Sequence, residues 1–183
     1  DQAGIVYCIR RTEVDELAAA LPRRGLRALP YHAGLADDER RANQEAFVNE
    51  RADIIVATVA FGMGIDRSNV RYVIHAGMPK SLEHYQQEAG RAGRDGLAAE
   101  CLLLHSGADY GLWKSVLGDP PPPGALQKLG EMYAFCQDAV CRHRALVMYF
   151  GQPYPAPSCG ACDVCLGETV AGGDTAEIAA KIL

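Results

Sequence analysis

One short segment of this sequence, Gln87 to Gly96, concentrates residues that can handle phosphates: Gln-Glu-Ala-Gly-Arg-Ala-Gly-Arg-Asp-Gly. Its arginines, Arg91 and Arg94, are three residues apart, and side chains at that spacing lie on one face of a helix. The glycine and alanine residues around them leave space for the guanidinium groups to reach a neighbouring surface. Paired guanidinium groups suit the phosphates of a nucleotide. We predict that Arg91 and Arg94 lie on one helix face and contact a nucleotide. The alternative is a solvated pair at a helix end.

A second candidate ligand loop follows an apolar run in the middle of the chain. Residues 53–59 read Asp-Ile-Ile-Val-Ala-Thr-Val, and Gly62 and Gly64 lie in the loop that follows. Open α/β sheets bind ligands at the carboxyl ends of their strands, and Thr58 and Asp66 occupy such positions. Because a Gly-x-Gly loop can also be a structural turn, it indicates a ligand site only together with the arginine pair.

Three cysteines near the end of the chain, Cys159, Cys162 and Cys165, have the spacing of metal ligands. The small and turn-forming residues between them let the thiols converge, and a tetrahedral zinc site then needs one more ligand. Cys136 and Cys141 are both available, but five residues place them about 140° apart around a helix, so one site would rarely use both. Cys136 falls on an apolar stripe, whereas Cys141 lies off it near a helix start. We predict that Cys141 completes the zinc site.

Other interpretations of the cysteines stay open. His143 is a rival ligand, but it is two residues from Cys141 and their side chains diverge on a helix, which favours a surface histidine. Iron–sulfur ferredoxins share the C-x2-C-x2-C spacing, but a fourth cysteine and a proline normally follow, and Leu166 follows here. Disulfides are rare in a reducing compartment. Cys8 and Cys101 lie in apolar runs, and we predict that they are small core residues.

The first hundred residues alternate β-rich runs with amphipathic runs. The predicted strands are Gly4–Ile9, Ala28–His32, Ile54–Val59, Tyr72–Ala76 and Cys101–His105. Helical patterns lie between them: Thr12 is predicted to cap a helix from Glu13 to Leu21, and Asp37 to cap a helix through Phe47. Near-continuous apolar strands that alternate with helices predict an α/β fold, with a parallel sheet covered by helices on both faces.

Beyond this region the β pattern disappears. Residues 118–124, Gly-Asp-Pro-Pro-Pro-Pro-Gly, break regular structure. Apolar residues then recur at helical spacing, which predicts a helical hairpin; they are Leu126, Leu129, Tyr133 and Cys136, then Leu146, Tyr149 and Phe150. We predict three parts: an α/β lobe in residues 1–107, a helical hairpin with the metal module in 108–168, and the start of a truncated domain in 169–183.

Composition narrows the classes of function. With 49% hydrophobic residues the chain has the composition of a globular protein. It shows neither an apolar run long enough for a membrane span nor a signal peptide, so we expect an intracellular, non-secreted protein. The net charge of −5 argues against bulk attraction to nucleic acid, so any DNA contact must be local. Arginine outnumbers lysine 14 to 4, which favours bidentate phosphate contacts or reflects a GC-rich genome.

The two candidate ligand segments resemble motifs V and VI of superfamily 2 helicases. Their sequences, Phe-Gly-Met-Gly-Ile-Asp and Gly-Arg-Ala-Gly-Arg-Asp-Gly, are similar to those of the RecQ branch. Val6-Tyr7-Cys8 with Arg11 resembles motif IV, and Tyr-His-Ala-Gly-Leu at residues 31–35 resembles the next family block. The cysteine segment fits as well, so the resemblance covers nearly the whole chain. It implies a second RecA-like lobe followed by a small, mainly helical zinc-binding domain.

The resemblance also implies roles for individual residues. Arg94 corresponds to an arginine finger, and Arg91 lies beside it at the nucleotide. The other residues implied at the nucleotide, between two lobes, are Gly64, Asp66 and Gln87. The residues implied at the phosphates of a DNA single strand, where contacts fix register without reading sequence, are Arg11, His32 and Thr58. The zinc ligands are Cys141, Cys159, Cys162 and Cys165.

Some features of the complete family are absent from the sequence. It contains no G-x-x-x-x-G-K-[ST] phosphate loop and no D-E-x-H motif. The resemblance therefore implies that ATP and Mg²⁺ are bound mainly by a missing N-terminal lobe, that this chain alone is inactive, and that residues 169–183 begin a winged-helix domain. It implies 3′ to 5′ unwinding of DNA, in repair or recombination, on single-stranded and partly duplex substrates.

Two alternatives to the interpretation as a RecQ-type helicase lobe stay open. One is a zinc-dependent scaffold protein, against which the intact arginine pair argues. The other is a superfamily 2 helicase of another branch that acts on RNA, against which the cysteine module argues.

Overall fold

The computed structural model describes residues 2–58, 61 and 67–168. The predictions for Gly62, Gly64, Asp66 and residues 169–183 therefore lie outside the described residues. The chain forms two compact units, Asp1–Cys136 and Gln137–Leu183, and each is considered by itself. No helix among the described residues is long and apolar enough to cross a membrane.

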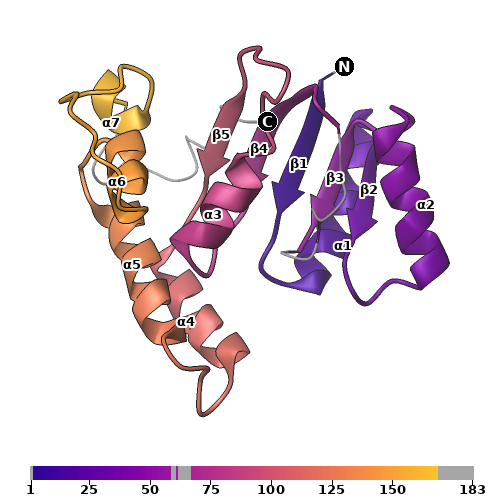
Figure 1. Ribbon diagram of the computed structural model, residues 1–183. Coiled ribbons are helices and arrows are strands. Elements are labelled where there is room, and N and C mark those ends of the chain that lie inside the picture. Colours follow the sequence, from indigo (N-terminus) through magenta and orange to yellow (C-terminus); the bar gives the residue numbers. More distant parts are fainter. Residues whose placement is uncertain (1, 59–60, 62–66, 169–183) are drawn as a thin grey trace. The chain divides into compact units, whose positions relative to one another are not determined.

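A parallel sheet of five strands, in the order β2-β3-β1-β4-β5, forms the centre of the first unit (Figure 1). The strands are β1 (Ala3–Tyr7), β2 (Ala28–Tyr31), β3 (Ile54–Ala57), β4 (Val70–His75) and β5 (Glu100–Leu103). All five predicted strands are present. The predicted parallel α/β sheet is confirmed.

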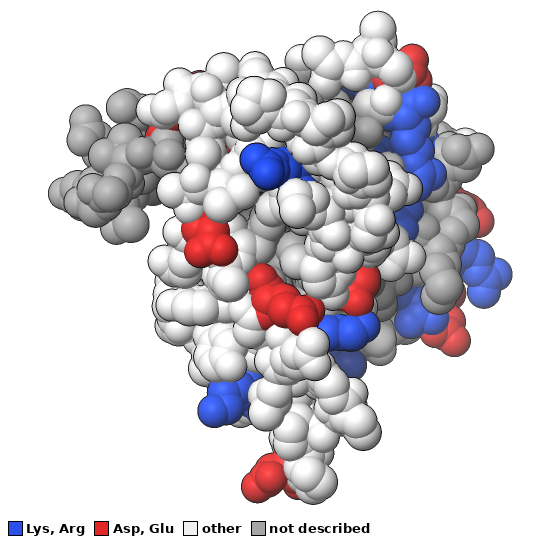
Figure 2. All heavy atoms as spheres, turned by 60° about the vertical axis from the view of Figure 1, so that its left-hand side comes forward, with Lys and Arg blue, Asp and Glu red and all other residues white. Residues whose placement is uncertain are grey.

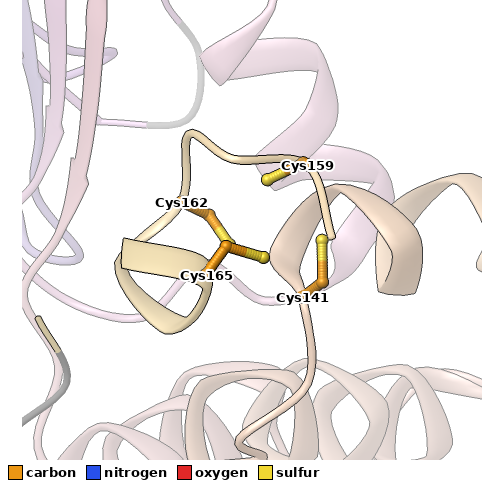
Figure 3. Close-up of side chains that lie close together, drawn as sticks. All are labelled: Cys141, Cys159, Cys162 and Cys165. Atoms are coloured by element: carbon orange, nitrogen blue, oxygen red, sulfur yellow. The ribbon is translucent and has the colours of Figure 1, made fainter. Parts of the chain in front are cut away.

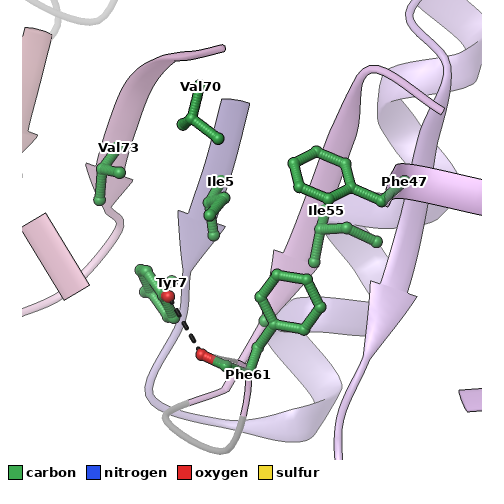
Figure 4. Close-up of a cluster of buried hydrophobic side chains, with 8 residues drawn as sticks. Ile5, Tyr7, Phe47, Ile55, Phe61, Val70 and Val73 are labelled. Carbon is green, nitrogen blue, oxygen red and sulfur yellow. Dashed lines mark hydrogen bonds between the residues drawn. The ribbon is translucent and has the colours of Figure 1, made fainter. Parts of the chain in front are cut away.

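Alternate side chains along the strands form two buried clusters, one on each face of the sheet. Figure 4 shows the first, in which Ile5 and Val73 of the sheet pack with Phe47 from α2 (Asp37–Val48) and with Phe61. The second contains Val6 and Cys8 and packs against α1 (Arg11–Ala20). Helices therefore cover both faces, which explains why the strands are apolar nearly throughout.

The two cysteines predicted to lie in the core differ. Cys8 is buried, and burial raises the pKa of its thiol to about 12. The prediction for Cys101 is wrong, because this residue is exposed. It lies in β5, which is an edge strand with only one neighbour in the sheet. An edge strand can have an apolar sequence although its side chains are not fully buried.

The helix starts predicted for α1 and α2 are wrong by one or two residues. Thr12 lies inside α1, whose cap is Arg10: the Arg10 backbone N–H donates to the carboxylate of Glu13. Helix α2 begins at Asp37, and its cap is Ala36. In both cases the sequence holds a good capping residue near the start, but acidic residues in the first turn stabilise the exposed N–H groups without a polar cap.

The remaining helices of the first unit are η1 (Leu21–Arg24), α3 (Leu82–Ala89), α4 (Gly107–Leu117) and α5 (Ala125–Gln137). Helix α4 was not predicted. It is anchored by Trp113, whose indole N–H donates to the backbone oxygen of Met78. Residues 118–124 are irregular, as predicted.

The second unit contains α6 (Arg142–Tyr149) and the short α7 (Asp163–Leu166). The two predicted helical runs are thus present as α5 and α6, although they fall in different compact units. Among the described residues of the second unit, 137–168, only Cys141 and Cys162 are buried. This unit is therefore organised around its cysteines instead of an apolar core.

Candidate functional site

Three candidate DNA-contacting residues lie at the same edge of the sheet. Arg11 begins α1 after β1, His32 follows β2, and Thr58 follows β3. Because β2, β3 and β1 are parallel neighbours, their carboxyl ends place these residues side by side. The Thr58 backbone N–H donates to the Tyr31 oxygen, which joins two of the three segments. This edge is where α/β sheets bind ligands.

His32 occupies a closed position within this edge. Its side chain is buried, Nε2 lies 2.9 Å from a carboxylate oxygen of Asp15, and Nδ1 accepts the Gly34 N–H at 3.0 Å. A Cβ added to Gly34 would lie 3.0 Å from that ring nitrogen and 3.3 Å from Cδ of Arg11. The histidine therefore shapes the turn over which Arg11 lies, whereas Arg11 itself is exposed.

The arginine pair does not lie on a helix, so this part of the prediction is wrong. Helix α3, whose N-terminus is capped by Ser81, ends at Ala89, and Arg91 and Arg94 lie in the turns that follow. Gly90 is the C-cap of α3, and Gly93 and Gly96 then adopt φ of 65° and 80°, which prevents a helix from continuing through the arginine segment. The turns, not a helix face, set the directions of the two arginines.

Arg91 is directed into the lobe. It is 7% exposed, and its Nε atom has no hydrogen-bond partner among the described residues. Burial raises the pKa of the Tyr7 hydroxyl, and the positive charge of Arg91 acts in the opposite direction, so the two side chains are neighbours. The Tyr7 hydroxyl donates to the Phe61 oxygen (Figure 4). A buried guanidinium with an unpartnered donor is uncommon in folded proteins, which marks Arg91 as a candidate functional residue.

A buried acid–base pair lies beside Arg91. His75 at the end of β4 and Glu88 in α3 are 2.8 Å apart, with side chains only 1% and 6% exposed. The His75 ring is stacked on Tyr7 and tilted against Tyr85, with centroids 5.4 and 5.2 Å apart. This network was not predicted from the sequence. Its only signal was a histidine inside an apolar strand together with a glutamate inside the arginine motif.

Arg94 and Gln87 lie on the surface of the lobe. The Arg94 Nε donates to the Gly90 oxygen at 3.2 Å, and this bond ties the side chain to the start of its own turn. Burial raises the pKa of the Tyr7 hydroxyl, and the positive charge of Arg94 opposes this rise more weakly than that of Arg91. The turns that follow α3 therefore carry one buried and one exposed arginine.

Charge is dispersed on the one face that Figure 2 shows. On the face shown in Figure 2, separate groups of basic and acidic side chains lie on a largely uncharged surface. With a net charge of −5, contacts with nucleic acid would depend on individual arginines such as Arg11.

In the second unit, four sulfur atoms converge from three short segments (Figure 3). Those of Cys141, Cys159, Cys162 and Cys165 all lie within 4.8 Å of one another. Cys141 is the residue before α6 and Cys162 is the residue before α7. Gly160, with φ of 65°, allows the turn between the second and third cysteine.

The chemistry of this cluster fits zinc. Zn–S bonds of about 2.3 Å require sulfurs about 3.8 Å apart in a tetrahedron, which four thiols gathered this closely can adopt. Backbone N–H groups of Arg142 and Ala161 donate to the sulfurs of Cys162 and Cys159 at 3.4 Å, as around a bound thiolate. Outside the cluster, Arg142 bonds the carboxylate of Asp163 through Nε and Nη2, both at 3.0 Å, and so joins α6 to α7.

Neither rival ligand is a member of the four-sulfur cluster. His143 is exposed, and its Nδ1 lies 3.2 Å from Cys159 Sγ, a hydrogen-bonding distance, so it supports a cysteine from outside. Cys136 lies in α5, half-buried, and is not in the cluster.

Comparison with known families and relatives agrees with this geometry. Residues 1–96 match the helicase conserved C-terminal domain, and residues 120–166 match the RecQ zinc-binding family. The chain is 45% identical to the ATP-dependent DNA helicase RecQ of Bacillus subtilis, over 100% of the chain and 31% of the relative. It is 43% identical to the RecQ-like DNA helicase BLM of Xenopus laevis, over 92% of the chain and 13% of that protein. The chain thus spans a third or less of these relatives.

Solved structures share the fold of the first unit. A DEAD box protein from Methanococcus jannaschii is 26% identical, with a TM-score of 0.54 over 63% of this chain and 32% of that one. The DEAD-box protein SrmB of E. coli is 24% identical, with a TM-score of 0.52 over 70% of this chain and 68% of that one. Because SrmB is only 24% identical in sequence, its similarity to this chain indicates a shared fold and nothing more.

Proposed function

The chain belongs to the RecQ family of DNA helicases, and we propose that it acts as one half of a motor. It comprises the helicase lobe and the zinc-binding domain of the C-terminal region of these proteins. It supplies the second RecA-like lobe of an ATP-dependent DNA helicase, and a first lobe binds ATP and Mg²⁺. We call the protein that carries both lobes the two-lobed helicase. Its activity is 3′ to 5′ unwinding of DNA, in repair or recombination.

The observation that carries this proposal is the pair of arginines in the turns that follow α3. Arg91 is buried with a free donor, and Arg94 is exposed on an adjacent turn. In phosphoryl transfer, negative charge develops on the transferred group, and an arginine supplied across a cleft stabilises it. Arg94 is the arginine finger, and Arg91 holds the phosphates beside it. The family resemblance also assigns Gln87, Gly64 and Asp66 to the nucleotide, although Gly64 and Asp66 lie outside the described residues.

The carboxyl edge of β1, β2 and β3 binds the DNA strand. Arg11 contacts a phosphate directly. His32, with both ring nitrogens engaged, acts by holding the turn beneath Arg11, and Thr58 offers a hydroxyl and the end of its strand. Such contacts position the strand but carry no base information, so binding is independent of sequence.

The zinc module is structural. When bound, zinc supplies four bonds that hold α6, α7 and the intervening loop together, through Cys141, Cys159, Cys162 and Cys165. All four positions of a tetrahedral ion are then filled, which is typical of structural and not catalytic sites. The cysteine module and the names of the relatives favour DNA over RNA as the substrate. The protein would work where DNA is, in the bacterial cytoplasm or the eukaryotic nucleus.

Reconstitution from two parts tests this function. Mixing this chain with a separately prepared ATP-binding lobe is expected to produce ATP hydrolysis that single-stranded DNA stimulates. The same chain with Arg94→Ala is expected to bind DNA without restoring hydrolysis. Hydrolysis equally restored by both chains would contradict the motor role of Arg94. No hydrolysis with the unchanged chain, despite binding of the two lobes, would favour a scaffold.

A further inference from the structure

Arg71, on β4, connects the strand to the turn that carries Arg94. Its guanidinium donates to four oxygens: the Asn69 carbonyl at 3.1 Å, the Ala98 carbonyl at 3.0 Å, and both carboxylate oxygens of Asp95 at 2.6 Å. The two side chains are 16% and 24% exposed. A partly buried arginine with this many charged and backbone partners is fixed in one geometry, unlike an exposed ion pair.

Asp95 is the residue after Arg94, and it closes the turn from the other side. Its carboxylate accepts the Leu97 N–H at 3.1 Å in addition to the bonds from Arg71. The hydrogen bonds from Arg71 lower the pKa of this carboxyl below its ordinary value, so it stays charged. The N–H of Gly93 donates to the Val70 oxygen at 2.9 Å, so the residues on both sides of Arg94 are joined to the start of β4.

Arg94 itself depends on this backbone for its direction. Its side chain is exposed, and its Nε bonds the Gly90 oxygen of the same turn. A finger of this kind stabilises a transition state only if its guanidinium reaches the right point, and a displacement of about 1 Å can cost on the order of 100-fold in rate. The rigidity of residues 93–98 therefore bears directly on catalysis.

We propose that Arg71 and Asp95 form a positioning pair, which holds the turn of residues 93–98 so that Arg94 points at the nucleotide. Neither residue touches the nucleotide. This inference rests on the proposed function of Arg94, and its test separates the two.

The test measures ATP hydrolysis by the two-lobed helicase with saturating single-stranded DNA. Arg71→Ala and Asp95→Ala are each expected to lower kcat about 10- to 100-fold, with KM for ATP changed less than about threefold, because the pair acts through the finger. The double variant should be no worse than the poorer single variant, since either change breaks the same pair. In an Arg94→Ala background, Arg71→Ala should cause no further loss of kcat.

Arg27 offers a matched control. Its Nε and Nη2 bond the two carboxylate oxygens of Asp53 at 2.8 and 2.6 Å. This pair has the same chemistry, but it lies beside β2 and β3, away from β4 and β5. Arg27→Ala should leave kcat unchanged. If Arg71→Ala does not fold, as judged by its thermal unfolding, Asp95→Asn gives the same comparison while keeping the shape of the side chain.

The outcomes separate the two ideas. If Arg94→Ala lowers kcat but the folded Arg71 and Asp95 variants retain it, the positioning pair is overturned and the finger stands. A further loss of kcat on adding Arg71→Ala to Arg94→Ala would also overturn the pair, because Arg71 would then act independently of the finger. Near-normal kcat in Arg94→Ala would overturn both.

Discussion

The Nε2 atom of His75 lies 2.8 Å from a carboxylate oxygen of Glu88, and both side chains are almost fully buried. The pair joins β4 to the end of α3, just before the turns that carry the arginines. Its histidine lies between the rings of Tyr7 and Tyr85. A polar contact of this kind is costly to disrupt from one side, because the partner is left buried without its bond.

Glu88→Ala is therefore expected to destabilise this chain by about 3 kcal/mol or more. Glu88→Gln, which keeps an oxygen acceptor at the same place, should cost less. Denaturant unfolding measures both. Glu16→Ala, at an exposed position of α1, is the control and should change stability by less than about 0.5 kcal/mol. Equal effects of Glu88→Ala and Glu16→Ala would show that the pair contributes nothing to folding.

The zinc site makes a prediction about the choice of cysteine. Purified chain should contain one zinc, and Cys141→Ser should lose it while Cys136→Ser keeps it. Because only Cys141 and Cys162 are buried in residues 137–168, metal binding should supply much of the folding free energy of that unit, as in zinc-finger peptides, where it is about 10 to 16 kcal/mol. A zinc chelator should therefore unfold that unit and abolish the helical signal of α6 and α7. Zinc content lost in Cys136→Ser and kept in Cys141→Ser would contradict the ligand set.

An ion pair between α3 and α5 predicts a dependence of stability on pH. Lys128 lies 2.6 Å from Glu83 and lowers the pKa of that carboxyl from 4.5 to about 2. A lowered folded-state pKa stabilises the protein fully above about 4.5, and the stabilisation is lost as the pH falls toward 2. Since the side chains are 53% and 35% exposed, we expect less than about 1 kcal/mol.

Glu83→Gln should consequently flatten the decline in unfolding free energy between pH 5 and about pH 2.5, and high salt should reduce the difference. Unfolding curves at a series of pH values give the comparison, with Glu16→Gln as the control. A variant curve parallel to that of the unchanged chain would show that the ion pair is too weak to matter.

Much of this architecture could be predicted from the sequence. The apolar run of β3 and the alternation of strands with helices indicated a parallel sheet, because strands buried on both faces must be apolar throughout. The cysteine spacing indicated a metal cluster, and the position of Cys141 at a helix start singled it out from Cys136. Each of these inferences used a local pattern with one dominant physical cause.

Inferences that depended on tertiary context were poorer. The spacing of Arg91 and Arg94 fitted a helix, but α3 ends at Ala89, and left-handed glycines at positions 93 and 96 keep the segment in turns. Cys101 has an apolar sequence environment, but whether a strand lies at an edge is decided by its neighbours in the sheet. The partnership of Glu88 with His75 joins residues 13 positions apart on different elements, and no local pattern reports it.

DNA binding by this chain alone should be weak, steeply dependent on salt and indifferent to base sequence. An acidic chain with a few placed arginines neutralises few phosphates, and each lost contact reduces the slope of log affinity against log salt by about 0.7 for a single strand. Arg11→Ala should show that reduction, whereas Arg23→Ala, in η1, should not. Fluorescence anisotropy with labelled single strands measures it. Preference for one base sequence that survives high salt would contradict phosphate-only contacts.

The most direct test of the account is the turnover of ATP when Arg94 is removed. This chain alone should hydrolyse no ATP, since it contains no phosphate loop. In the two-lobed helicase with single-stranded DNA, Arg94→Ala should lower kcat by on the order of 10³ to 10⁵, with little change in KM for ATP or in DNA affinity. Arg23→Ala, at an exposed position, should keep normal turnover. Near-normal kcat in Arg94→Ala would contradict the assignment of Arg94 as the arginine finger.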